Sequence, residues 1–160
     1  YLIPMATLAT DKKKRSEYSA QDFAEIRGNC VASNLGRANR IVSRIYEEAF
    51  RDVGISSPQF GMLVAVKIRP GVTAGEIADT LSSDPSTVSR NTEVLARRGL
   101  LKIVPGKDKR VRSYFLTSDG NRTIQACVPR WKEAQRRALK KIGRSRWREM
   151  RRWLRRLSIT

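Results

Sequence analysis

The stretch "DPSTVSRNTEVLARRGLLKIVPGKDKRVRSYFLTSDG", which begins at Asp84, constrains the fold of this chain more than any other segment. Asp84 is a good helix N-cap, Pro85 suits the first helical turn, and Gly99 can end the helix in the left-handed conformation. The segments "LLKIV" and "VRSYFLT" flank "PGKDKR", in which proline and glycine mark a turn. We therefore predict a helix from Pro85 to Arg98 and a basic β-hairpin over residues 100–117.

Two further helices are expected just before this stretch. Ser57 is placed to cap a helix that begins at Pro58 and ends by Pro70–Gly71. In "TAGEIADTL", Thr73 and Glu76 have the spacing of a capping box, which predicts a helix of about two turns. A short helix, a tight turn, a second helix and a basic hairpin together predict a winged helix-turn-helix.

The flanking segments are also helical in pattern. A long helix is expected from about Asp22 to Asp52, because apolar residues form a heptad-like seam of Val31, Leu35, Ala38, Val42, Ile45 and Ala49. Another helix should start at Thr117 and be kinked or restarted by Pro129. Its expected buried residues are Ile124, Val128, Trp131, Ala138 and Ile142. The segment "SRWREMRRWLRRL" is amphipathic, with Trp147, Met150, Leu154 and Leu157 at spacings of three and four.

Composition narrows the possible functions. The 160 residues include 33 Lys and Arg against 15 Asp and Glu, a net charge of +18, which favours a polyanionic partner. With two cysteines and no histidine, zinc fingers are excluded and the commonest general base is missing. We find no paired carboxylates, phosphate loop or nucleophile elbow, and predict neither a catalytic activity nor a cofactor or metal. No apolar run spans a bilayer and no export signal is visible, so a cytoplasmic protein without a membrane partner is expected.

The helix after Asp84 has a polar face that suits the major groove of DNA. Val88, Thr92 and Leu95 fall on its buried side, and its exposed side carries Ser86, Arg90, Glu93 and Arg97, with Thr87 and Asn91 beside it. Short hydroxyl side chains allow a close approach, and arginine and asparagine offer donors to bases and phosphates. The expected wing carries Lys107, Lys109, Arg110 and Arg112. Alternatively, the hydroxyls only start a helix and the wing cations are only solvated.

The same stretch resembles the MarR family of transcriptional regulators. The matching elements are "STVSR", "Arg98-Gly99-Leu100", "Asp108-Lys109-Arg110" and "Leu116-Thr117", together with the helices upstream. This resemblance implies a mainly α-helical fold with a small β-hairpin wing. It also implies a homodimer whose interface comes from the first helix and the last two. The expected regions are a flexible arm over 1–20, a dimerisation region over 21–54 and 118–160, and a winged helix-turn-helix lobe over 55–117.

The resemblance further implies a role for particular residues. Two recognition helices of the dimer would read a pseudo-palindromic double-stranded operator. The residues expected in the major groove are Ser86, Thr87, Ser89, Arg90 and Asn91. Arg110 would enter the minor groove, and Asp108 would either hold Arg110 or only cap the turn.

Members of this family often act as repressors that a signal releases. The expected signal is an aromatic or anionic small molecule in a pocket lined by Tyr46, Phe60, Met62 and Trp131. The alternative is oxidation of Cys30, whose placement is similar to that of a peroxide-sensing cysteine, although Asn34 stands where that branch commonly has a tyrosine. Cys127 is expected to be a packing residue.

The positive charge is concentrated at the C-terminal end. Residues 129–160 hold 13 Lys and Arg against Glu133 and Glu149, a surplus of 11. This segment lies outside the expected reading head, so it is either a solvated face or a contact for bent DNA, RNA, an acidic partner or an anionic membrane. From the winged helix-turn-helix pattern and the family resemblance, we predict a repressor that associates with the nucleoid. The alternatives are a non-specific nucleic-acid-binding protein and a membrane-surface or acidic-partner module.

Overall fold

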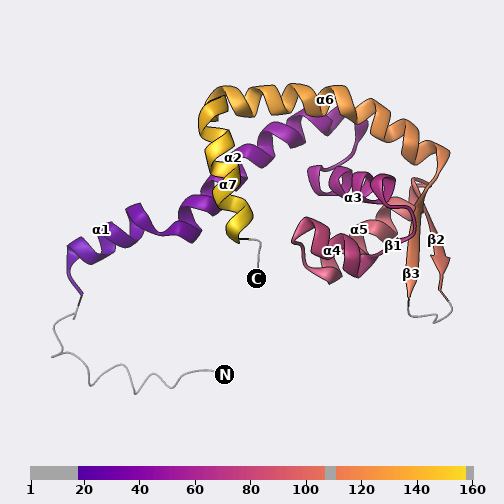
Figure 1. The fold of residues 1–160 in the computed structure, drawn as a ribbon, viewed down its shortest axis with the longest axis horizontal. Helices are drawn as coiled ribbons and strands as arrows, with labels where there is room; N and C mark the ends of the chain where they lie inside the picture. Colours follow the sequence, from indigo (N-terminus) through magenta and orange to yellow (C-terminus); the bar gives the residue numbers. More distant parts are fainter. Residues whose placement is uncertain (1–17, 107–110, 158–160) are drawn as a thin grey trace, which may run out of the picture. The chain divides into compact units, whose positions relative to one another are not determined.

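The computed structural model describes residues 18–106 and 111–157 (Figure 1). Its elements in chain order are α1 (Ala20–Asn29), α2 (Val31–Phe50), the short 3-10 helix η2 (Arg51–Val53), α3 (Ser57–Ile68), β1 (Val72–Thr73), α4 (Ala74–Leu81), α5 (Pro85–Arg97), β2 (Leu101–Pro105), β3 (Arg112–Leu116), α6 (Ser118–Ile142) and α7 (Arg144–Leu157). The expected fold class, mainly helical with a small β-hairpin wing in a winged helix-turn-helix lobe, is confirmed. None of the described helices has the length and apolar character needed to cross a membrane.

The chain divides into two compact units, one ending at Arg40 and the other beginning at Ile41. In the first unit, the expected single helix is wrong, because it is interrupted at Cys30, whose ψ of 114° is not helical. The Asn34 side-chain amide donates hydrogen bonds of 2.9 Å to the carbonyl oxygens of Gly28 and Cys30 and so compensates for the interruption. Glycine and asparagine are weak helix formers, and the sequence has both just before this point.

The heptad-like seam divides between the two units. Val31, Leu35 and Ala38 are exposed in the first unit, whereas Ile45 is buried and Val42 and Ala49 are half-buried in the second. The periodicity therefore predicts an apolar face correctly. It does not say what covers that face.

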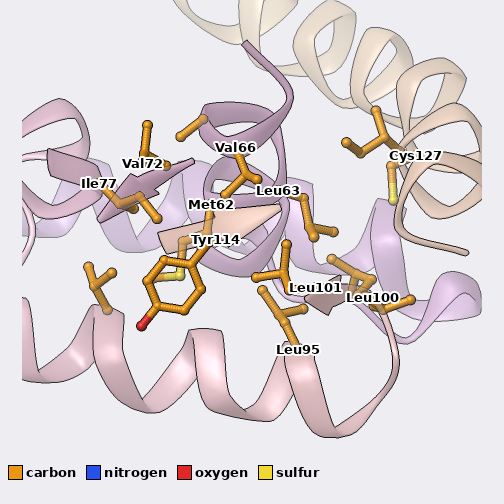
Figure 2. Close-up of a cluster of buried hydrophobic side chains, with 14 of the residues drawn as sticks. Met62, Leu63, Val66, Val72, Ile77, Leu95, Leu100, Leu101, Tyr114 and Cys127 are labelled. Atoms are coloured by element: carbon orange, nitrogen blue, oxygen red, sulfur yellow. The ribbon is translucent and has the colours of Figure 1, made fainter. Parts of the chain in front are cut away.

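The core of the second unit lies among α3, α4, α5, the sheet and the start of α6 (Figure 2). Met62, Leu63 and Val66 of α3 meet Leu95 of α5 and Tyr114 of β3, and all five are at most 1% exposed. Each fully buried aliphatic or aromatic side chain of this size stabilises the fold by about 1.5–3 kcal/mol. This core packs the inner face of α5 against the rest of the lobe.

The sheet has the order β1-β3-β2 and is antiparallel throughout. The expected hairpin is β2 and β3, with Leu101 opposite Leu116. Strand β1, whose Val72 pairs with Tyr114, was not expected from the sequence pattern. Two residues show no alternating pattern, so such a strand is recognised only from its partner.

Local capping signals set the helix starts in this lobe. The capping box of Thr73 and Glu76 and the cap by Asp84 are confirmed. Gly99 has a φ of 71°, in the left-handed region expected for it. The cap of α3 is Ser56 and not Ser57, because Ser56 completes a capping box with Gln59.

Helix α6 is continuous through Pro129, so of the two expected effects of this proline, a kink or a restart, the restart does not occur. A small buried cluster of Ile45, Ala134 and Ala138 joins α6 to the second half of α2. The Arg137 guanidinium also donates to the Glu48 carboxylate at 2.8 Å, and the Tyr46 hydroxyl donates to Gln135. Ile124 and Ala138 of α6 are buried, as expected. Val128 and Trp131 of the same helix were also expected to be buried, but they are exposed.

Candidate nucleic-acid interface

A tight turn joins α4 to α5. Ser82 adopts the left-handed conformation, with φ 48° and ψ 48°, and the Ser83 amide donates to the Ala78 carbonyl at 2.9 Å. In α5, Val88, Thr92 and Leu95 are fully buried, as the sequence predicted. The Thr92 hydroxyl donates to the Val88 carbonyl at 3.0 Å, which satisfies it in the core. The opposite, polar face of α5 is therefore the one presented to solvent.

The leading end of α5 is held by Asp84. Its carboxylate accepts hydrogen bonds from the Ser86 hydroxyl and, at 3.0 Å, from the Thr87 amide. These bonds, with the Ser86 hydroxyl contributing most, hold the pKa of the Asp84 carboxyl below its usual value. Because the Ser86 hydroxyl proton already points at Asp84, its oxygen is left as an acceptor for a partner.

Asn91 is attached to the scaffold more firmly than the sequence suggested. Its side-chain amide donates to the Thr87 carbonyl at 2.9 Å, and its oxygen accepts from Gln59 of α3 at 3.4 Å. Asn91 is half-buried. It therefore helps position α5 on α3, and Gln59, which sequence analysis did not single out for this role, is its partner.

The remaining expected groove residues differ in exposure. Thr87 and Arg90 are exposed, and Ser89 is half-buried. Among the described residues, Arg90 forms no hydrogen bond or ion pair with another side chain. Its five guanidinium donors are thus available to acceptors on base edges or phosphates.

One expected wing residue, Arg112, lies at the base of the wing on β3. Its guanidinium pairs with Glu93 of α5 at 3.1 Å, and both side chains are about half exposed, at 52% and 49%. An exposed pair contributes little to stability. It does join α5 to the wing, a role of Glu93 that the sequence pattern did not predict. The other expected wing residues, Lys107, Asp108, Lys109 and Arg110, lie outside the described residues.

An open hollow of about 600 Å³ lies beside α5, the start of α4 and β3. It is lined by Thr73, Ala74, Gly75, Ser89, Glu93, Val111, Arg112 and Tyr114. The exposed face of α5 and the base of the wing therefore border a concave, partly polar surface.

Three of the residues expected in a ligand pocket lie together. Tyr46, Phe60 and Trp131 line an open, mostly apolar cavity of about 610 Å³, to which Lys132 adds a positive charge. Burial raises the pKa of the Tyr46 hydroxyl. Met62 does not join them, because it is 1% exposed in the core. The cavity also includes Ile68 and Val128, whose exposure the sequence pattern did not predict.

Cys30 belongs to the first unit, whereas the cavity lies within the second. It sits immediately before α2, half-buried, where hydrogen bonds from the Ser33 side chain and then the Ser33 amide lower the pKa of its thiol. Cys127 is fully buried in the core, as expected, and burial raises the pKa of its thiol.

Both the sequence and the fold of this chain are similar to those of known transcriptional regulators. Residues 53–110 match the sequence model of the MarR family. The uncharacterised HTH-type transcriptional regulator YybA of Bacillus subtilis (strain 168) is 23% identical over 95 residues, covering 59% of this chain and 63% of that protein, less than two thirds of its length.

Solved structures share the fold. The M. tuberculosis transcriptional regulator MosR, in complex with DNA, is 29% identical over 81% of this chain and 93% of its own, with a TM-score of 0.72. BpsR of Bordetella bronchiseptica is 22% identical, with 81% and 94% coverage and a TM-score of 0.73. The match of residues 53–110 to the family model and the shared fold confirm the resemblance of this chain to the MarR family of transcriptional regulators.

Proposed function

We propose that the protein is a repressor that binds a specific double-stranded DNA sequence with α5 in the major groove and the wing beside it. The observation that carries this is the division of α5 into two faces. Its inner face is locked in the core, and its outer face presents Thr87, Ser89 and Arg90 to solvent. A rigidly held helix with free polar groups at its leading end suits base reading. The function requires binding alone, without a catalytic step.

The working form is a homodimer. In the first unit, Phe23, Ile26 and Val31 are 57%, 62% and 69% exposed, and in the second unit Leu157 of α7 is 70% exposed. Large apolar side chains that are exposed on the helices of each unit favour a protein partner. A second copy would cover them and supply a second α5. The operator is then a pseudo-palindrome with half-sites about 34–36 Å apart.

A small molecule with an aromatic ring and an anionic group releases the DNA. The apolar cavity beside Tyr46, Phe60 and Trp131 suits the ring, and Lys132 suits the charge. BpsR, which shares the fold, is described as having its DNA binding regulated by 6-hydroxynicotinic acid. A ligand that prefers one arrangement of the two reading heads shifts the population and lowers operator affinity.

The deciding experiment is a binding titration with the DNA upstream of the protein's own coding sequence and a scrambled duplex of equal length, each at two salt concentrations. We expect tighter binding to the upstream DNA at both, because base contacts depend on salt less than phosphate contacts do. Equal affinity for both duplexes, and for fragments from across the genome, would contradict sequence reading.

Release is tested on the same complex with a panel of aromatic carboxylates. An active compound should quench Trp131 fluorescence and dissociate the upstream duplex. Lys132→Met, which removes the charge and keeps the length, should weaken that compound and leave DNA affinity unchanged. A compound that releases DNA equally well from this variant acts elsewhere.

A second candidate signal is oxidation of Cys30, favoured by the lowered pKa of its thiol. We expect iodoacetamide to alkylate Cys30 much faster than Cys127, and at a pH below that of an ordinary cysteine, because the thiolate is the nucleophile. Ser33→Ala removes the main stabilising hydrogen bond and should move the rate profile to higher pH. Mass spectrometry of the digested protein distinguishes the two cysteines. Equal rates at both would remove the basis for this signal.

A further inference from the structure

Helix α7 carries many positive charges that no acidic side chain among the described residues neutralises. Its 14 residues, "RSRWREMRRWLRRL", contain seven arginines and one glutamate, and all seven arginines are exposed. At 3.6 residues per turn, six of them lie within an arc of about 140°. These six, here called the arginine face, are Arg144, Arg148, Arg151, Arg152, Arg155 and Arg156. Trp147, Met150 and Leu154, on the opposite side of the helix, are half-buried.

The arginine face destabilises the isolated helix. No acidic residue lies in the first turn, where the helix dipole favours one, and Arg144 stands there instead. Pairs such as Arg148 with Arg152 and Arg151 with Arg155 are four residues apart, and like charges at that spacing repel each other. None of these arginines forms an ion pair with a described residue. An anionic partner would remove this repulsion.

The neighbouring helix shows the contrast. In α6, Arg136 pairs with Glu133 at 2.6 Å and Arg137 pairs with Glu48 at 2.8 Å. Those two arginines thus have partners within the fold. The arginines of α7 form no such ion pair with a described residue, and the Arg156 guanidinium instead lies 4.6 Å from the centre of the Trp153 ring on the same helix.

The spacing of the charges matches a nucleic-acid strand. The six arginines of the arginine face, on a 14-residue helix that rises about 1.5 Å per residue, give about one positive charge per 3.5 Å. One strand of duplex DNA carries one phosphate per about 3.4 Å of its axis. Arginine binds phosphate oxygens with two parallel donors, and the cationic residues of α7 are all arginine.

A membrane surface fits less well. A helix that lies on a bilayer inserts its whole apolar face. Here that face is partly covered, because Trp147, Met150 and Leu154 are half-buried in the chain by itself and α7 packs against α6. All six residues of the arginine face are exposed, and on the apolar side only Trp153 and Leu157 are.

We propose that the arginine face of α7 binds the phosphate backbone of duplex DNA, as a sequence-independent contact separate from the reading head on α5. This backbone contact is additional to the proposed base reading by α5, and the two do not depend on each other. It adds affinity for any duplex long enough to reach α7, and it accounts for a large part of the charge surplus at this end of the chain.

The test is the salt dependence of binding to the scrambled duplex. We expect the combined change Arg148→Gln, Arg151→Gln and Arg155→Gln to make the slope of log affinity against log salt shallower by about 2–3, since each lost phosphate contact removes about 0.9. The same variant should lose affinity for the upstream duplex by the same factor. Lysine at the three positions should keep the slope close to that of the wild type.

The matched control removes the same charge elsewhere, with Arg44→Gln, Arg51→Gln and Arg122→Gln, three exposed arginines outside α5 and α7. Its slope should stay near the wild-type value, because long-range attraction is screened beyond about 8–10 Å. Circular dichroism checks that both variants fold. Equal slopes for the two glutamine variants would overturn the proposal. So would binding of phosphatidylserine vesicles through the three α7 arginines with an unchanged DNA slope. A preference for upstream DNA that survives in the α7 variant leaves the proposed function standing in either case.

Discussion

Arg90→Ala is expected to abolish most of the preference for the upstream duplex over a scrambled one. Arg90 is exposed on α5, five residues after the helix start at Pro85, and has no side-chain partner among the described residues. A well-placed arginine contact to a base contributes about 1–3 kcal/mol of discrimination, so two protomers would lose about 2–6 kcal/mol. That corresponds to about 30-fold to 10⁴-fold in the ratio of the two affinities.

The control for this change lies on the same helix. Arg97 is also exposed and is seven residues, about 10 Å, further along α5. Arg97→Ala removes the same charge and should lower the affinity for both duplexes by a similar, small factor. Fluorescence anisotropy with the two duplexes measures both variants. If Arg90→Ala lowers both affinities equally, Arg90 contacts only phosphate, and base reading falls to Thr87 and Ser89.

Gly120→Ala is expected to destabilise the fold strongly. Gly120 lies in the first turn of α6, and a Cβ there would lie 2.2 Å from the Leu100 carbonyl oxygen and 2.9 Å from Leu116 Cδ2. The Leu100 carbonyl cannot easily move, because it accepts hydrogen bonds from the Thr117 amide and hydroxyl, at 3.2 and 3.3 Å. The start of α6 must therefore separate from the end of α5 and the wing. We expect a loss of about 2–4 kcal/mol in the free energy of unfolding.

Thermal unfolding followed by circular dichroism measures this loss, which should lower Tm by about 5–15 °C for a chain of this size. Gly75→Ala is the matched control, because a Cβ at Gly75 of α4 meets nothing closer than 4.0 Å. Alanine is the better helix former by about 0.5–1 kcal/mol, so this variant should be as stable as the wild type or more so. An unchanged Tm for Gly120→Ala would show that the start of α6 does not pack closely against the Leu100 carbonyl.

The winged lobe was predictable because its signals are local. The Thr73 and Glu76 capping box, the Asp84 cap and the Gly99 stop act between a side chain and a backbone within a few residues. The buried positions of α5 follow from helical periodicity in the same way. The family resemblance added the assembly of these elements, and the fold confirms the winged helix-turn-helix.

Other features depend on neighbours that are distant in the sequence, and no local pattern reveals them. Strand β1 exists only because β3 pairs with it, and Gly120 is constrained only by the Leu100 carbonyl. The pattern placed Val128 and Trp131 in a core, but they are 37% and 39% exposed and line an open cavity instead.

In the candidate site, too, some features follow from local sequence patterns and others depend on distant neighbours. The sequence by itself determined which residues form the outer face of α5, because the 3.6-residue period assigns faces without any knowledge of the partner. Only the tertiary structure decided what those residues are free to do. Asn91 is held by Gln59, Glu93 by Arg112, and the Ser86 hydroxyl points at Asp84, whereas Arg90 is left with its donors free. Hydrogen bonds between side chains of different elements form only when packing brings those elements within about 3 Å, and that distance is a property of the whole fold.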